Sequence, residues 1–144
     1  MKRLLATSND LSFTILRLAL GVVFFAHGAQ KMLGWFGGFG FHSTMQFLEH
    51  TGLPAPVAFL VICAEFFGGL GLIVGLFTRI AALGIAADMI GAVLLVHLPN
   101  GFFMNWMGNQ KGEGFEFHLL AIATAAALLL RGAGAFSADH ALSK

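Results

Sequence analysis

The chain has 144 residues, of which 58% are hydrophobic and only 10% charged, and this composition excludes an ordinary soluble globular domain. Its length suits one domain, residues 1–144, in a membrane. The formal net charge of +1, with scattered Lys and Arg, argues against a nucleic-acid partner. The single cysteine, Cys63, excludes an internal disulfide, a CxxC pair and a cysteine-rich metal site.

Four segments are long and apolar enough to cross a bilayer, which takes roughly 20 mainly apolar residues in a helix. They are residues 11–32, 54–76, 79–98 and 115–130. The predicted fold class is therefore all-α, a polytopic membrane protein with a four-transmembrane-helix bundle. The first segment follows Met-Lys-Arg, but its apolar run is longer than a signal core and no clear small-x-small cleavage site follows. We expect it to be retained.

The distribution of cations predicts the orientation, because cytoplasmic loops carry an excess of Lys and Arg. If the N-terminus is cytoplasmic, Lys31 and Lys111 lie outside, and five cations lie inside: Lys2, Arg3, Arg79, Arg131 and Lys144. Both termini are therefore expected in the cytoplasm. Arg17, near the inner end of the first span, is expected to snorkel to the same side.

The connections between the spans differ in character. Phe41, Met45 and Leu48 are three or four residues apart, which suggests a short amphipathic helix in the outer interface, with an ordinary loop as the alternative. The connection at 77–78 is so short that the second and third spans should be antiparallel neighbours. Segment 99–114 has the Gly and Asn residues of a loop but also Phe, Met and Trp, so we expect it to dip back onto the membrane.

Small residues on three spans are expected to bring the helices together, because lipid offers no hydrophobic drive for helix association. They are Ala64, Gly68, Gly71 and Gly75 on the second span, Gly84, Ala87 and Gly91 on the third, and Ala121, Ala123, Ala125 and Ala127 on the fourth.

Ionisable residues inside the spans should face the bundle, because lipid disfavours them. One stripe of the first span, at about 100° per residue, carries several of them. It comprises Arg17, Leu20, Phe24, His27 and Lys31. Counting about 1.5 Å per residue along each span places five residues in the outer third of the membrane, with Glu65 beneath them. They are His27, Lys31, His97, Glu116 and His118. The sequence thus predicts a polar pocket under the outer surface, in which Lys31 pairs with Glu65 or Glu116.

Each of these residues also has a plainer interpretation. Lys31 at a helix end could snorkel, and Glu116 at a helix start is favoured by the helix dipole whatever its function. Asp88 could form a structural bridge with Arg17 or stay protonated. The histidines of the spans could be ligands or hydrogen-bonded core residues, and His118 could also be interfacial. Two further histidines are expected in exposed loops: His42 and His50.

The residue types favour some ligands over others. No HxxxH or HExxH spacing supports a metal or haem, and no Gly-rich loop after a strand supports a nucleotide. A quinone fits better, because its carbonyls accept hydrogen bonds from His and Lys and its reduction consumes protons that His or Glu can relay. Its ring can stack on aromatic residues of the same depth: Trp35, Phe102, Phe103 and Trp106.

Three stretches together resemble the DoxX family of small four-helix membrane proteins. They are LRLALGVVFFAHGAQKM, PVAFLVICAEFFGGLGLIVGLFTRIAAL and GEGFEFHLLAIATAAALLLRGAGAFSADHAL, so the resemblance runs from Leu16 to Leu142. It implies the bundle, a multi-pass place in the bacterial inner (plasma) membrane, and a link to quinone and oxidoreductase systems. It carries over five positions: His27, Lys31, Glu65, Glu116 and His118.

The leading hypothesis is a redox-associated membrane protein that binds a quinone or a similar small aromatic ligand. Lys31 and a histidine would polarise a carbonyl, Glu65 would hold the lysine or relay a proton, and Trp106 would cover the ring. The expected binding residues are His27, Lys31, Glu65, His97, Trp106, Glu116 and His118. One alternative is a non-enzymatic scaffold that anchors a soluble oxidoreductase partner, and another is a small-solute transporter that works as a homo-oligomer.

Overall fold

The computed structural model describes residues 2–143, and every regular element within them is helical. The long helices are α2, α4, α5 and α6, and shorter elements lie at the chain ends and in two connections. In chain order they are α1 (Lys2–Leu5), α2 (Leu11–Leu33), η1 (Trp35–Gly37), α3 (Gly40–His50), α4 (Ala55–Val74), α5 (Thr78–Ala92), η2 (Val93–His97), η3 (Leu98–Asn100), α6 (Glu116–Arg131) and α7 (Ala138–Leu142).

Three helical stretches are long and apolar enough to cross a membrane, and they confirm the first three predicted spans within a few residues. They are Leu11–Leu33, Ala55–Val74 and Thr78–Asn100, the last of which continues α5 through η2 and η3. α6 has only 16 residues, so it is about 24 Å long at 1.5 Å per residue. That length is somewhat less than the roughly 30 Å of a typical hydrocarbon core.

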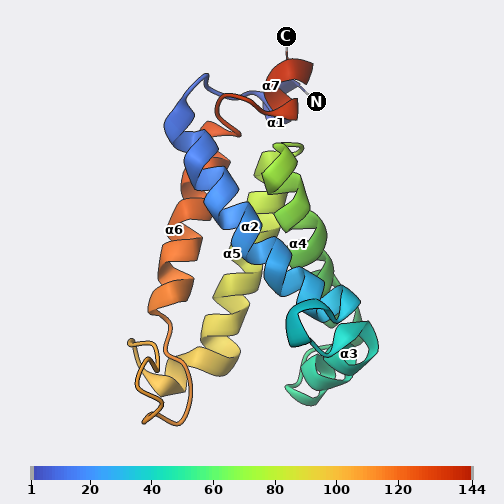
Figure 1. Ribbon diagram of the computed structural model, residues 1–144, viewed down its shortest axis with the longest axis vertical. Coiled ribbons are helices and arrows are strands. Elements are labelled where there is room, and N and C mark those ends of the chain that lie inside the picture. The colour runs from blue at the N-terminus through green and yellow to red at the C-terminus, as the bar shows by residue number, and fades with distance from the viewer. Residues whose placement is uncertain (1, 144) are drawn as a thin grey trace.

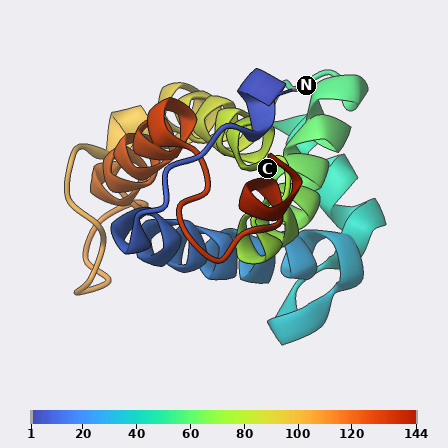
Figure 2. The ribbon, with the colours of Figure 1, turned by 90° about the horizontal axis from the view of Figure 1, so that it is seen from above.

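The helices follow one another around the bundle, as Figures 1 and 2 show. α2 packs on α4, α4 on α5, and α5 on α6, and the α2–α4 contact is the most extensive of these. A smaller contact between α6 and α2 closes the ring. The predicted antiparallel pairing across residues 77–78 is confirmed. Both chain ends lie at one end of the bundle, which we call the termini end. α3 and residues 101–115 lie at the other, which we call the loop end.

The closest approach between helices is made by glycines of α2 and α4. A Cβ atom on Gly28 would lie 2.3 Å from the backbone nitrogen of Phe66, and one on Gly69 would lie 2.3 Å from that of Phe25. Neither glycine was among the small residues predicted to bring the helices together. Of those that were, Ala64 and Gly84 bring α4 and α5 together, whereas Gly91 has no neighbour within 4 Å.

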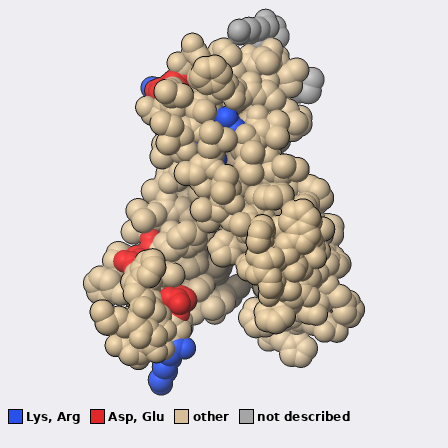
Figure 3. Space-filling view, in the orientation of Figure 1, with Lys and Arg blue, Asp and Glu red and all other residues tan. Residues whose placement is uncertain are grey.

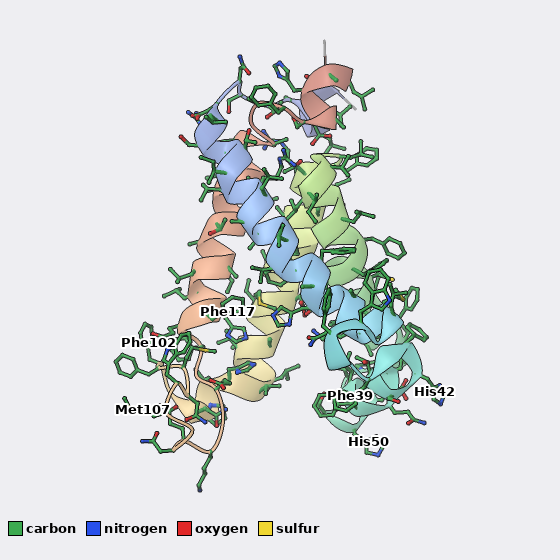
Figure 4. All side chains as sticks on the ribbon, in the orientation of Figure 1. Phe39, His42, His50, Phe102, Met107 and Phe117 are labelled. Carbon is green, nitrogen blue, oxygen red and sulfur yellow. The ribbon has the colours of Figure 1, made fainter. Side chains whose placement is uncertain are left out.

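α3 confirms the amphipathic helix predicted between the first two spans. The ring of Phe41 packs edge-on against that of Phe59 on α4, with centroids 6.2 Å apart. His42 and His50 are exposed, as Figure 4 shows, but they lie on this helix. Their assignment to loops was therefore wrong, because the helix begins directly after the Gly-rich turn.

Arg17 corrects a prediction at the termini end. Its side chain does not snorkel, because the residue is only 1% exposed. All three guanidinium nitrogens donate hydrogen bonds to backbone carbonyls: Nε to Ala133 at 3.0 Å, Nη1 to Ile73 at 2.7 Å and to Leu72, and Nη2 to Phe136 at 3.2 Å. These carbonyls belong to the end of α4 and to the segment after α6. Arg17 thus joins three parts of the chain.

The segment after α6 folds across the termini end of the bundle, as the view in Figure 2 shows. Asp139, at the start of α7, is 1% exposed, and its carboxylate accepts hydrogen bonds from the backbone N–H groups of Phe77 at 2.8 Å and Thr78 at 2.9 Å. These are N–H groups that the beginning of α5 cannot pair within its own helix. Asp139 therefore caps α5 from a distant part of the sequence.

Candidate functional site

The loop end of the bundle is open. In Figure 3 a gap separates the part built by α3 from the part built by α5, α6 and residues 101–115, and acidic side chains gather on the latter. Figure 4 shows the same division, with Phe39, His42 and His50 on one side and Phe102 and Met107 on the other. The long helices diverge here, which leaves their polar side chains room to face one another.

Lys31 and Glu65 form the ion pair that the sequence predicted. The Lys31 ammonium lies against both carboxylate oxygens of Glu65 and joins the end of α2 to the middle of α4. The Glu65 side chain is only 4% exposed, whereas that of Lys31 is 30% exposed. Because an ammonium has three N–H donors, one of them remains available on the accessible side. The other candidate partner of Lys31, Glu116, is engaged elsewhere.

Asp88 joins this ion pair from α5. Its carboxyl group lies within hydrogen-bonding range of Glu65 and interacts electrostatically with Lys31. Its Oδ2 atom is buried without a hydrogen-bond partner. The predicted bridge between Asp88 and Arg17 is therefore wrong, because Arg17 is bonded to carbonyls at the termini end. We call Lys31, Glu65 and Asp88 the charged triad.

His97 and His118 form a second polar group, with ring centroids 4.0 Å apart. Nδ1 of His97 lies 2.8 Å from the carbonyl oxygen of Glu113, so this nitrogen must carry the proton and donate it. In the neutral ring, Nε2 of His97 is then a free acceptor. His97 closes the π-helical turn η2, a kind of distortion frequent at functional sites. His118 is only 6% exposed, and its Nδ1 is buried without a hydrogen-bond partner.

His27 lies on α2 between Phe24 and Lys31, two residues whose partners the structure shows. One turn earlier on α2, the ring of Phe24 stacks on Phe117 of α6 with centroids 6.5 Å apart, and Figure 4 shows Phe117 at the upper limit of the gap. One turn later, Lys31 reaches Glu65 of α4. Residues spaced by three or four share one face of a helix, so His27 lies on the face that borders the gap. Its side chain is exposed.

Glu116 and Trp106 belong to the structure of the loop. The Glu116 carboxylate accepts hydrogen bonds from the backbone N–H of Met104 at 2.8 Å and from Nε1 of Trp106 at 3.3 Å. Trp106 is 84% exposed, so its ring covers none of the polar groups in this structure. Glu116 is the first residue of α6 and holds residues 101–115 against it. Of the seven predicted residues, the structure thus pairs Lys31 with Glu65 and His97 with His118, leaves His27 exposed on α2, and engages Glu116 and Trp106 within the loop.

Two apolar grooves lie beside the bundle. One, of about 540 Å³, runs between α4 and α5, and the other, of about 180 Å³, runs between the ends of α5 and α6. The second groove continues a stripe on each helix, because Val93 and Leu94 precede His97 by one turn and Ile122 follows His118 by one turn. Within residues 2–143 no three His, Cys, Asp or Glu side chains are grouped in a way that could hold a metal ion.

Comparisons with known proteins agree with the fold and with the sequence resemblance. The family model described as DoxX matches residues 12–98. A Bacillus subtilis protein named "Putative oxidoreductase CatD" is 33% identical over 92% of this chain and 87% of its own length. The inner membrane protein YqjF of Escherichia coli is 32% identical over 94% of this chain and 95% of its own length.

A third relative, the uncharacterized membrane protein Rv3486 of Mycobacterium tuberculosis, is 32% identical over 99% of this chain and 88% of its own length. No solved structure matches the chain at a significant level. The matched model covers more than half of the chain, and the relatives cover nearly all of it. The chain therefore belongs to the DoxX family and is a multi-pass protein of the bacterial inner membrane.

Proposed function

We propose that the loop end binds a small aromatic molecule of the quinone class, and that the protein takes part in redox chemistry at the membrane. What supports the proposal is that each of the four long helices carries ionisable side chains toward the loop end, where two polar groups form, the charged triad and the histidine pair. α2 contributes His27 and Lys31, α4 Glu65, α5 with η2 Asp88 and His97, and α6 His118. Such residues are rare inside membrane segments and mark functional sites.

The proposed membrane arrangement has α6 as the fourth span and both termini in the cytoplasm. The support for four spans is that α6 packs along α5 over its length and runs back to the termini end (Figure 1). The support for the orientation is the excess of Lys and Arg at that end. In this arrangement the gap opens toward the outer face of the membrane.

The hydrogen-bonding groups suit the two carbonyls of a quinone. The remaining N–H of Lys31 can donate to one carbonyl, and His27 is exposed on the same helix face. Nε2 of His97 can accept from the hydroxyl of the reduced form, and the buried Nδ1 of His118 has no hydrogen-bond partner among residues 2–143. A buried polar atom without a partner costs about 1–3 kcal/mol, so a ligand that supplies the partner gains affinity.

The groove between the ends of α5 and α6 suits the tail of such a ligand. It is lined by apolar side chains only, and it lies one turn from both histidines: Ile90, Val93, Leu94, Phe115, Leu119 and Ile122. A polar head beside His97 and His118 would place an isoprenoid tail along this groove. The name of the Bacillus subtilis relative adds support for a redox role.

Titration of a short-tailed quinone against the purified protein in lipid nanodiscs, followed by calorimetry, tests the proposal. We expect saturable binding that Lys31→Gln and Glu65→Gln each weaken at least tenfold, since one lost charge-assisted hydrogen bond is worth about 1.4 kcal/mol or more. Lys111→Gln and Glu49→Gln are matched controls, because both residues are exposed and outside the gap. No saturable binding, or equal binding by all four variants, contradicts the proposal.

A scaffold function is the second candidate, and the exposed aromatic side chains of residues 101–115 favour it. Phe103 is 67% exposed, Trp106 84% and Met107 88%, which suits contact with a soluble oxidoreductase. Co-purification distinguishes the two functions. A scaffold keeps its protein partner in Lys31→Gln and loses it when Trp106 and Met107 are replaced by Ser. Quinone binding, by contrast, should weaken in Lys31→Gln and persist when Trp106 and Met107 are replaced.

A further inference from the structure

Glu65 and Asp88 bring two carboxyl groups together inside the bundle. They lie on adjacent antiparallel helices, α4 and α5, within hydrogen-bonding range of each other. Glu65 is only 3% exposed, and Oδ2 of Asp88 is buried. Two ionised carboxylates cannot donate a hydrogen bond to each other, so the close approach requires a proton between them or leaves like charges in contact.

The positive charge facing these carboxyl groups is insufficient for both. From α2 it is the Lys31 ammonium, and its N–H groups are directed at Glu65. On α6 the residues packed beside this part of α5 are apolar, among them Ala121 and Ala125. Arg17 is bonded to carbonyls at the termini end. With every group ionised, the charged triad would carry a net charge of −1 in a water-poor interior.

We infer that the charged triad is a proton-binding site in which Glu65 and Asp88 hold one exchangeable proton between them. The bound proton makes the triad neutral and lets Asp88 donate to Glu65, which also accepts from Lys31. It removes the like-charge contact and gives the carboxyl group of Asp88 a hydrogen-bond partner. The site stands without any other ligand. A role in passing the proton to a bound quinone through Lys31 rests on the proposed function.

Infrared spectroscopy of the protein in lipid, without any quinone, tests this inference. A protonated carboxyl group has a C=O stretching band distinct from that of a carboxylate, and the band shifts in D₂O when the proton exchanges. At neutral pH we expect such a band in the wild-type protein. Asp88→Asn should abolish it, because the remaining Glu65 is neutralised by Lys31. Glu65→Gln should abolish or shift it, because the partner of Asp88 has changed.

Glu49→Gln is the control, since Glu49 is an exposed acid on α3, and the band should stay unchanged in it. A wild-type protein without the band, or a band unchanged in Asp88→Asn or in Glu65→Gln, overturns the inference. If one of the two variants does not fold, the wild-type band, its shift in D₂O and the other variant still assign the proton. A protein that shows the band but binds no quinone keeps the proton site and loses only the proposed function.

Discussion

The two ends of the bundle differ in the hydrogen-bond partners of their buried charged residues. At the termini end, Arg17 and Asp139 are each 1% exposed, and they are bonded to backbone groups of α4, α5 and the C-terminal segment. At the loop end, the charged triad and the histidine pair bond partly to one another. Two of their buried atoms, Oδ2 of Asp88 and Nδ1 of His118, have no partner.

The difference distinguishes buried groups that stabilise the fold from buried groups that are available to a ligand or a proton. A charged group bonded to several backbone groups fixes the fold, because no ligand can compete for those bonds without opening the bundle. A buried group without a partner costs stability and is retained where a ligand or a proton completes it. The termini end also contains buried atoms without partners, but these are two hydroxyl groups and one nitrogen of Arg79, whose other nitrogens are bonded: Ser8 Oγ, Thr78 Oγ1 and Arg79 Nε.

Replacing Arg17 should have the largest effect on stability. Arg17→Met removes hydrogen bonds to four carbonyls and leaves those groups unpaired, so we expect the free energy of unfolding to fall by about 3 kcal/mol. Denaturant titration in micelles measures this. Arg131→Gln, at the same end but exposed, should change it little. A variant at Arg17 that unfolds like the wild type would show that the termini end does not hold the bundle together.

Substitution of Gly28 tests the contact that lets α2 diverge from α5 and α6 while it stays on α4. Gly28→Ala places a Cβ atom 2.3 Å from the backbone of Phe66, so α2 and α4 must separate, at a cost of about 1–3 kcal/mol. Gly91→Ala is the control, because nothing lies within 4 Å of it. Thermal unfolding compares them. Equal melting temperatures for the two variants would mean that α2 and α4 can accommodate a methyl group at position 28 without separating.

Asp139→Asn should have a moderate effect. One oxygen can still accept from the start of α5, but the charge and one hydrogen bond are lost, so we expect a loss of about 1 kcal/mol. Hydrogen exchange at the amides of Phe77 and Thr78 should accelerate, while exchange at the start of α6 should not. Unchanged exchange at both places would mean that Asp139 does not cap α5.

His118→Phe should have the smallest effect on stability and a large effect on binding. Its Nδ1 makes no hydrogen bond, so replacing the ring with an apolar one should leave the free energy of unfolding unchanged or raise it slightly. Quinone binding should weaken. A marked loss of stability would instead show that His118, like Arg17, stabilises the fold.

Much of the loop end could be predicted from the sequence, because helix geometry fixes which residues share a depth. The spacing of the spans predicted Lys31 beside Glu65 or Glu116, and the structure pairs it with Glu65. The position of Asp88 beside Glu65 was also present in the sequence, since both residues are equally far from the turn between Leu76 and Phe77. Because α4 and α5 are antiparallel, residues equally far from the turn lie at the same depth. This equal distance predicts the partner of Asp88 better than the opposite charge of Arg17 does.

The termini end could not be predicted in the same way. The partners of Arg17 and Asp139 are backbone groups, which every residue has, so no side-chain pattern identifies them. They come together only because residues after α6 fold across the bundle. At the loop end, the engagement of Glu116 with the backbone of Met104 depends likewise on the path of a loop. The π-helical turn that carries His97 has no signal in the hydrophobic pattern.

The most direct test of the open polar gap is the access of water to His27. In a Cys63→Ala background, His27→Cys and Phe67→Cys place thiols on two exposed positions, one facing the gap and one in the apolar groove of α4. Only a thiol that meets water ionises and reacts with a hydrophilic maleimide. We expect the cysteine at position 27 to react rapidly, and more slowly with a short-tailed quinone present, and the cysteine at position 67 to remain unmodified. Equal resistance of both thiols would contradict a shared polar gap at the loop end.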